Sequence, residues 1–435
     1  MKFKRLLTAA MFSVLFVQCE LKDHSLPETE FPADVANAWM RMQIRLTRTT
    51  PGYNSFVSNR SFGYAGVTMY ESVLPAIPGA SSLLSQIGGQ ALLANKQSEE
   101  YYWPASLNAA MADLTRKFFE STSPANMTAI DSLEAAYKTQ FATESSAEKI
   151  TNAENFGRLV STSIFEWSKT DGGDQAYKHL TDPTYIPPVG PGLWIPTPPA
   201  FAAPVHPHWG ENRSFIASSV TLTQPGPPTP YSEDPNSAFY KMVNELYTTS
   251  LSLTHEDSIT VKFWGDQPGN LNVPSHSTNI LAQLIVKEKL NLYEAAAAYA
   301  AQGVAMYAAS ISVMKTKYTY TLIRPISYIR NVMGHATWNT VIPTPPHGEY
   351  SAAHAVVSAA CATVLENIFG KDYKFSDATY PNGYGTRSYD SFDAAAKEAG
   401  RSRLLGGLHY SPSITTGLVQ GRQIGEMAVK LDIKY

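Results

Sequence analysis

Cysteine is scarce in this sequence, which has only two in 435 residues, Cys19 and Cys361. Two cysteines can form at most one disulfide bond, and Cys19 lies in an N-terminal segment with the features of a processed signal, so no disulfide framework is expected. Cys361 falls within an expected helix, where a free cysteine is ordinarily a small core residue. The fold must therefore be stabilised by side-chain packing.

An excess of charge of one sign is missing as well, and long apolar runs are few. The formal net charge of −3 excludes a generally basic surface for nucleic acid, so any positive site must be local. One apolar run, residues 6–17, follows the basic residues Lys2, Lys4 and Arg5 and is too short to span a membrane comfortably. This pattern predicts an export signal.

Cys19 stands where such a signal would be cleaved, and it resembles the lipid-modified cysteine of bacterial lipoproteins. Residues 16–18, Phe-Val-Gln, differ from the small residues that usually precede that cysteine, so secretion without a lipid is the alternative. We expect residues 1–19 to be a signal peptide with a lipid-attachment cysteine. The protein would then be exported to the cell envelope, in the periplasm or at the outer membrane, and would touch the membrane through its lipid only.

The remaining sequence is rich in helical patterns. With 44% hydrophobic residues the chain can form a substantial core. Segments from Pro32 onward repeat apolar residues at helical spacing, and no stretch shows the sustained alternation typical of a strand. We therefore predict an all-α fold made of helical bundles, with residues 20–175 as an N-terminal helical region.

Proline marks the next boundary, because roughly half of the 29 prolines fall in residues 176–235. Proline disfavours helix interiors, so this segment should be a long extended loop. Trp194 and Trp209 within it predict a loop that is ordered and packed over one end of the helices, while a floating linker is the alternative. Residues 236–435 should form a C-terminal helical bundle, which includes the alanine-rich stretch 290–320.

Strong hydrogen-bond donors stand in KYTYTLIRP, residues 317–325. Lys317 and Arg324 are seven residues apart, which is two helical turns, so they share one face. Arg324 directly precedes Pro325 and should lie at the helix end.

A histidine stands in the first helical turn of SAAHA, residues 351–355. Ser351 is a suitable N-cap, and the first-turn amides of Ala352, Ala353 and His354 would then point outward as an anion site. His354 could act as acid or base on an oxyanion that the same amides hold.

The third piece is SRLLGGLHY, residues 402–410, in which Arg403 and His409 flank two glycines. The glycines allow the chain to bend, so both side chains can reach one point. Convergence of Lys317, Arg324 and Arg403 would place three cations around one small guest. Only a tetrahedral oxyanion with two or more charges justifies burying so much positive charge together.

Taken in order, the patterns Lys-x6-Arg-Pro, a histidine that opens a helix in place of Pro-Ser-Gly-His, and Ser-Arg-x5-His resemble a known three-part signature. Vanadium-dependent haloperoxidases and type 2 phosphatidic-acid-phosphatase-like (PAP2-like) acid phosphatases share it. The resemblance directly covers residues 317–417. The exported helical N-terminal half is more similar to the bacterial haloperoxidase branch than to the short or membrane-embedded phosphatases.

The resemblance implies an enzyme and a role for each site residue. Lys317, Arg324 and Arg403 would hold the oxygens of vanadate, or of phosphate in its place, with the amide of Ala353 in the same site. His409 would be the apical ligand of the metal, and His354 the general acid or base. In the leading interpretation the substrates are hydrogen peroxide and a halide.

Two alternatives stay open from the sequence. An acid phosphatase would use the same residues on a phosphate monoester, with His409 attacking phosphorus and His354 protonating the leaving alcohol. A glycan-binding surface lipoprotein would use the many Tyr and Trp residues, although it leaves the three cationic segments unexplained. His347 falls where bromide-oxidising members also have a histidine, so it could bind peroxide or tune halide choice, unless it is a surface or capping residue.

Four positions depart from the family pattern. Ala352 and Ala353 replace a serine and a glycine, so one hydroxyl donor is lost, for which Ser351 could compensate. Met314 replaces a frequent tryptophan, and Ser413 replaces the aspartate often found four residues after the apical histidine.

Other polar residues are weaker candidates. Asp266 could pair with a site arginine, with Trp264 beside it as a packing residue. His206 and His208 could suggest a metal ion, but no second ligand cluster has a matching spacing, so packing on the aromatic loop is expected. His276 is expected in a loop, where it could face the mouth of a pocket.

Overall fold

The computed structural model describes residues 31–95, 97–265 and 269–434. The predicted signal segment with Cys19, and the candidate Asp266, lie outside the described residues. Within the described part of the chain, no helix combines the length and the apolarity that crossing a membrane requires.

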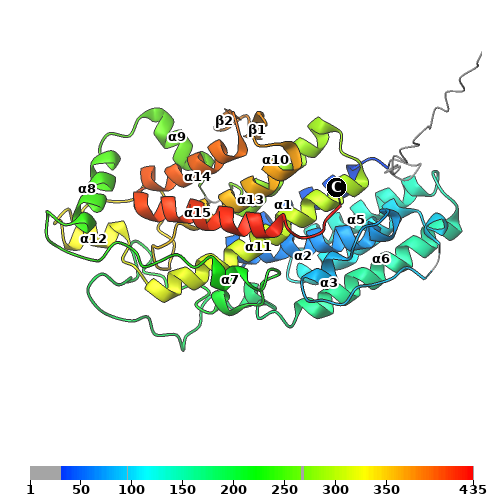
Figure 1. Ribbon diagram of the computed structural model, residues 1–435, viewed down its shortest axis with the longest axis horizontal. Coiled ribbons are helices and arrows are strands. Elements are labelled where there is room, and N and C mark those ends of the chain that lie inside the picture. The colour runs from blue at the N-terminus through cyan, green and yellow to red at the C-terminus, as the bar shows by residue number, and fades with distance from the viewer. Residues whose placement is uncertain (1–30, 96, 266–268, 435) are drawn as a thin grey trace, which may run out of the picture.

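The protein is an elongated helical body, which confirms the predicted all-α class (Figure 1). Helices of the N-terminal half gather at one end and those of the C-terminal half at the other. The N-terminal helices are α1 (Asp34–Thr49), α2 (Ser55–Val73), α3 (Leu83–Gln86), α4 (Trp103–Phe118), α5 (Pro124–Phe141) and α6 (Ala147–Ser168). The later helices are α7 (Ser219–Leu222), α8 (Ala238–Ser250), α9 (His255–Phe263), α10 (Val273–Glu288), α11 (Leu292–Tyr320), α12 (Pro325–Asn331), α13 (Ala353–Phe369), α14 (Phe392–Leu405) and α15 (Ser411–Ala428).

The long helix α11 joins the two halves, because it packs against α2 on one side and α13 on another. Its alanine-rich faces are almost entirely buried. At Gly66 of α2, an added Cβ would lie 2.4 Å from the carbonyl oxygen of Tyr299, so the two backbones touch. This close packing places the last turn of α11, which carries Lys317, at a fixed distance from the start of α2.

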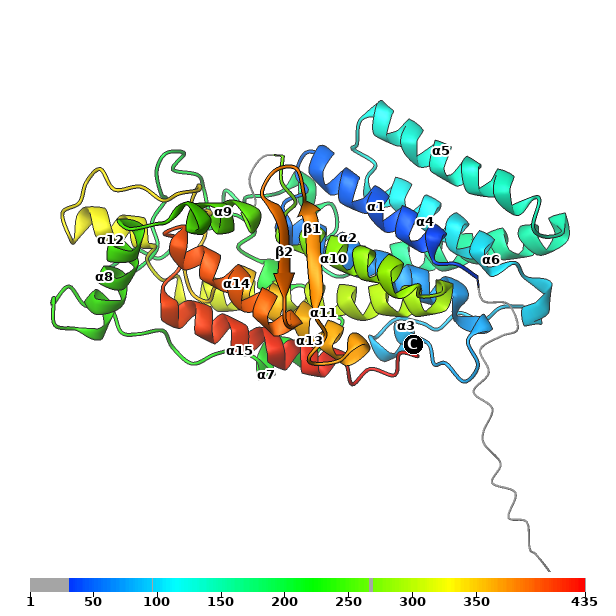
Figure 2. The same ribbon diagram turned by 90° about the horizontal axis from the view of Figure 1, so that it is seen from above.

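A small hairpin interrupts the helical pattern. Strand β1 (Phe375–Tyr380) pairs antiparallel with β2 (Gly385–Tyr389) beside α10 and α14 (Figure 2). The strands were not predicted because their alternating burial extends over too few residues. Asp377 of β1 lies 2.7 Å from Nε2 of His276 in α10. The expectation that His276 is a loop residue was therefore wrong, since it is a buried helical residue held by a carboxylate.

The proline-rich segment packs on the body. Trp194 and Trp209 are both buried. The indole of Trp209 donates to Ser310 of α11 over 3.1 Å, and the backbone amide of Trp194 donates to the carbonyl of Thr321 over 2.6 Å. The segment between these two residues thus lies along the C-terminal part of α11, where Lys317 is.

Candidate active site

The structure brings the predicted site residues together from separate elements. Lys317 is in the last turn of α11, Arg324 precedes α12, Arg403 is in the last turn of α14, and His409 precedes α15. The residues that line one cavity include His347, Ala353, His354, Arg403 and His409. Lys317 and Arg324 are fully buried, and Arg324 contacts His409 and His347 of this lining.

Backbone carbonyl groups bind the side chains of the two buried cations, Lys317 and Arg324. Lys317 Nζ donates to the backbone carbonyls of Gly348 and Glu349, over 3.1 and 2.9 Å. Arg324 Nε donates to the carbonyl of His347 over 2.9 Å. These bonds fix the side chains in place but leave their charges uncompensated.

Lys317, Arg324 and Arg403 form a buried cation cluster. Each of the three is at most 2% exposed, and the charge of the buried Glu349 acts on both Lys317 and Arg324. Within the described part of the chain, the cluster thus places three cations near this carboxylate. Burial, together with repulsion from Arg324 and Arg403, holds the pKa of Lys317 well below its ordinary value. A bound anion with two charges would relieve this repulsion.

His409 is oriented by that carboxylate. Its Nδ1 lies 2.9 Å from Oε1 of Glu349, and because an ionised carboxylate only accepts, Nδ1 carries the proton. Burial and the charge of Arg324 lower the pKa of His409 well below its usual range, so the ring is neutral. Its lone pair is then on Nε2, which lies 3.3 Å from Nη1 of Arg324. A neutral nitrogen at a cation cluster can bind a metal centre or attack phosphorus.

Sequence reasoning missed Glu349. Its other oxygen accepts from the hydroxyl of Ser413 over 2.7 Å, the residue that stands where the family often has aspartate. The carboxylate for His409 therefore comes from a segment 60 residues away. The absence of that aspartate was the available clue. A buried imidazole without its usual carboxylate partner is expected to bind a carboxylate from elsewhere in the chain.

His354 faces the same cavity from the start of α13. Its Nε2 lies 3.1 Å from the carbonyl oxygen of Trp264, which can only accept, so Nε2 carries a proton in that bond. In the neutral ring, Nδ1 is then the nitrogen that can take a proton. Arg403 Nη1 reaches the same carbonyl at 3.5 Å. Trp264, expected only to pack, thus also orients two site residues through its backbone.

The predicted cap of this helix was wrong. Helix α13 begins at Ala353 with Ala352 at the N-cap, and no side chain caps it. The hydroxyl of Ser351 donates instead to Gln420 over 2.7 Å, so it neither caps the helix nor replaces the lost family serine. The helix starts one residue later than expected, and Ser351 bonds to α15. The N-cap residue Ala352 therefore offers the first-turn amides of α13 no side-chain acceptor, and Ala353 lines the cavity.

His347 is buried and not a surface residue. Its Nδ1 lies 3.0 Å from Nη2 of Arg324 and 3.1 Å from the carbonyl of Gly348. Burial and the charges of Lys317 and Arg324 hold its pKa well below the ordinary value, so the ring is neutral. Since the guanidinium is the stronger partner, Nδ1 accepts from Arg324 and the proton remains on Nε2.

His206 and His208 lie in different surroundings. The described residues contain no group of three or more His, Cys, Asp or Glu side chains that could hold a metal ion. His206 is buried beside Phe56 and Trp209, and its Nε2 lies 2.9 Å from Nδ2 of Asn54. His208 is exposed, 3.1 Å from Asp182.

Burial lowers the pKa of His206 to about 4. Between pH 6.5 and about 4, the unfolded chain protonates this histidine while the folded protein does not, so the free energy of unfolding falls as the pH falls. We expect His206→Asn, which tolerates the left-handed backbone at φ 49°, to remove up to about 3 kcal/mol of that decline. Urea unfolding of both proteins at pH 4 to 7 measures it, and parallel curves would contradict the prediction.

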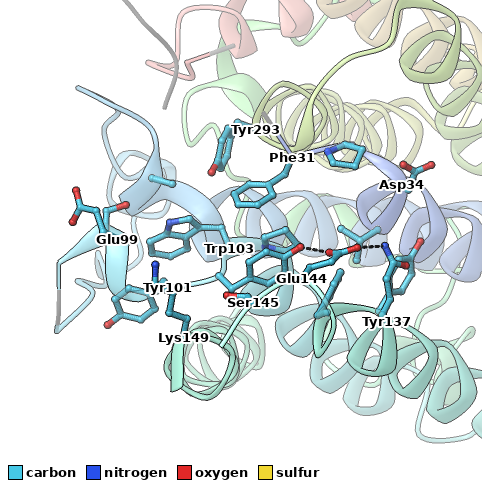
Figure 3. A pocket seen from close by; sticks show the side chains of 18 residues that line it. Phe31, Asp34, Glu99, Tyr101, Trp103, Tyr137, Glu144, Ser145, Lys149 and Tyr293 are labelled. Carbon is cyan, nitrogen blue, oxygen red and sulfur yellow. Dashed lines mark hydrogen bonds between the residues drawn. The ribbon is translucent and has the colours of Figure 1, made fainter. Parts of the chain in front are cut away.

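Two large cavities lie at opposite ends of α1. The one at the cluster has a volume of about 570 Å³ and includes Thr47, whereas the other, of about 810 Å³, includes Asp34. With a rise of 1.5 Å per residue these positions are roughly 20 Å apart. The larger cavity is bordered by aromatic residues such as Tyr101 and Trp103, with Glu144 at its edge (Figure 3). It contains no residue of the cation cluster, so the smaller cavity is the candidate active site.

Comparison with known proteins finds similar chains. The family described as the VCPO second helical-bundle domain matches residues 297–435, and no curated protein matches the chain. The structure described as that of the first bacterial vanadium-dependent iodoperoxidase is 28% identical, with a TM-score of 0.81 over 94% of this chain and 98% of that one. The holo-type bacterial vanadium-dependent chloroperoxidase is similar in fold, with 16% identity and a TM-score of 0.65 over 90% of this chain and 92% of that one.

Proposed function

This chain belongs to the superfamily of vanadium haloperoxidases and PAP2-like phosphatases, and on that premise we propose that it oxidises halide with hydrogen peroxide at a vanadate bound in the cation cluster. The observation that carries the proposal is the convergence of the buried side chains of Lys317, Arg324 and Arg403 on the lone pair of His409. Vanadate is a tetrahedral oxyanion that accepts a nitrogen ligand, so it fits both features. The likeness to the bacterial iodoperoxidase extends over both halves of the chain.

Each residue would have a distinct task toward this anion. Lys317, Arg324 and Arg403 would neutralise and orient its oxygens. His409 Nε2 would bind its central atom, and Glu349 would orient the His409 ring for this bond. When bound, vanadate supplies a Lewis-acidic centre that activates hydrogen peroxide toward halide.

Proton transfer would depend on the other two histidines. The overall reaction, X⁻ + H₂O₂ + H⁺ → HOX + H₂O, consumes one proton. His354, which faces the cavity from the start of α13, is the candidate to carry that proton. His347 keeps a proton on Nε2, so it can donate a hydrogen bond to an oxygen in the cavity.

A phosphatase is the second candidate, because the neutral lone pair of His409 could also attack phosphorus. The two activities are tested on one preparation of the purified protein with and without orthovanadate. We expect vanadate-dependent, saturable oxidation of iodide by hydrogen peroxide, and iodide is the first halide to test because of the iodoperoxidase likeness. Hydrolysis of p-nitrophenyl phosphate without any vanadate-dependent oxidation of iodide or bromide would overturn the proposal in favour of the phosphatase.

We also propose that the enzyme works outside the cytoplasm, on a lipid anchor at Cys19. The N-terminal sequence alone supports this proposal. Mass spectrometry of the mature N-terminus tests it, and a chain that retains residues 1–18 would refute it.

A further inference from the structure

The backbone of Trp264 reaches the active site from the end of α9. Its carbonyl oxygen lies 3.1 Å from Nε2 of His354 and 3.5 Å from Nη1 of Arg403. A carbonyl oxygen only accepts hydrogen bonds, so its place helps to fix the direction of both donors. Helix α9 ends at Phe263, and the position of this carbonyl therefore depends on the contacts of the Trp264 side chain as well as on the helix.

A carboxylate holds the edge of the Trp264 indole. Nε1 donates to Oε1 of Glu398 in α14 over 2.8 Å, and the tryptophan is only 5% exposed. The same carboxylate accepts from the hydroxyl of Tyr389 over 2.7 Å and pairs with Nε of Arg387 over 2.8 Å. Tyr389 and Arg387 belong to β2. The hairpin thus fixes the carboxylate that binds the indole.

The other strand of the hairpin supports the face of the same indole. The ring of His276 stacks on it, with ring centroids 4.6 Å apart and an angle of 22° between the planes. Nε2 of His276 lies 2.7 Å from Oδ2 of Asp377 in β1, and both side chains are buried. The edge and the face of Trp264 are therefore both tied to the hairpin. None of the described residues that line the active-site cavity belongs to this hairpin.

We propose that Glu398 is a positioning residue of the active site. Through the indole N–H it sets the place of Trp264, whose carbonyl then orients His354 and Arg403. The β1–β2 hairpin supports Glu398 from outside the cavity. This inference rests on the proposed function and adds to it the residue that positions the candidate proton carrier.

The connectivity of the helices explains why this contact matters. Glu398 and Arg403 are both in α14, whereas Trp264 follows α9 and His354 is in α13. The bond between Glu398 and the indole therefore connects the end of α9 to α14 beside the cavity. Since small misplacements of reacting groups lower rates strongly, a loose Trp264 would impair the site without removing any group from it.

The imidazole signals of His354 in the vanadium-free protein give the first test, because they are independent of activity. Nitrogen spectra of protein labelled with ¹⁵N-histidine report the hydrogen bonding of each ring, and the signal that is absent from His354→Gln identifies this one. We expect Trp264→Phe, which removes the indole N–H, to shift the signal. Glu398→Met should also shift it, and there the indole ring stays in place, so a change of aromatic ring is excluded as the cause. An unchanged signal in both variants would overturn the inference.

The double variant shows whether Glu398 acts through Trp264. Once Trp264→Phe has removed the indole N–H, Glu398→Met should cause no further shift of the His354 signal. A further shift as large as in the wild-type background would overturn the proposed route. Trp39→Phe is the matched control, because Trp39 also donates from Nε1 over 2.8 Å, to Asn108, and is not among the described residues that line the cavity. A shift of the His354 signal in this control as large as in Trp264→Phe would contradict the inference.

Steady-state kinetics give the second test. At saturating vanadate we expect kcat for iodide oxidation to fall about ten-fold in Glu398→Met and in Trp264→Phe. KM for iodide should stay nearly unchanged, because a misplaced proton carrier affects the chemical step. Glu398→Gln keeps an oxygen that can accept from the indole, so it should retain most of the activity.

Two kinetic results would contradict the positioning role. One is a loss of kcat in Glu398→Gln as large as in Glu398→Met, and the other is the same loss in the control Trp39→Phe. If Glu398→Met does not fold, Trp264→Phe and its control decide alone. A wild-type protein that does not oxidise iodide would refute the proposed function, whereas the His354 signal would still decide on the role of Glu398.

Discussion

Lys317→Met is expected to reduce vanadate affinity by about 100-fold and to abolish halide oxidation at micromolar vanadate. Methionine keeps the length of the side chain but removes one of three buried charges, and charge-assisted bonds to a desolvated oxyanion are each worth about 1.5–3 kcal/mol. Calorimetric titration with orthovanadate measures the affinity directly. The iodide assay then shows whether activity is lost in parallel.

The same substitution should stabilise the protein that lacks vanadate. Lys317 is fully buried and repelled by Arg324 and Arg403, so its removal relieves a cost of folding. We therefore expect a higher Tm for the variant without vanadate, and little further rise when vanadate is added. Lys315→Met is the matched control, because Lys315 is exposed on the same helix. A variant that binds vanadate as the wild type does would contradict the cation cluster as the anion site.

Glu349→Gln should lower activity by roughly 10- to 100-fold, the usual effect of removing a partner that orients a metal ligand. Glu349 holds the proton of His409 on Nδ1 and keeps the lone pair on Nε2. An amide can present either its oxygen or its NH₂ group, so the ring loses its fixed tautomer. Iodide oxidation at saturating vanadate measures the change.

The pH dependence separates this positioning role from a general loss of structure. The charge of Glu349 raises the pKa of Lys317, against the stronger effect of burial. Without the carboxylate, Lys317 loses its proton at a lower pH, so vanadate binding should fail at a lower pH on the alkaline side. A second change, Ser413→Asp, returns a carboxylate beside position 349, since the two side chains are 2.7 Å apart. The double variant should regain part of the activity, and an unchanged alkaline limit in Glu349→Gln would argue against the role.

The helical class and the site segments were accessible from the sequence because both depend on local patterns. Apolar residues repeated every 3.6 positions predict a helix whatever the path of the chain in the folded protein. The intervals from Lys317 to Arg324 and from Arg403 to His409 lie within single segments, so their spacing could be compared with a family signature. The roles assigned to these residues are still predictions, but the structure places Arg403 and His409 in the lining of one cavity and Arg324 against His409.

Other features depended on contacts that no local pattern encodes. Glu349 binds His409, which is 60 residues later in the sequence. Its carboxylate also accepts from Ser413, the residue that stands where the family often has aspartate. Ser351 has the right residue type for a cap but bonds to Gln420, because the helix starts later. The hairpin around Asp377 was missed because its strands are too short to show a period.

By itself the sequence determined the all-α class and the three cationic segments, and it predicted an oxyanion as their common guest. Tertiary structure alone decided which carboxylate orients His409 and which half of the chain builds the cavity wall with Phe56 and Asn59. The physical reason is that helix formation and the spacing within a motif are set by neighbouring residues. The partner of a buried charge or ring, in contrast, is set by how distant helices such as α2 and α11 pack against each other.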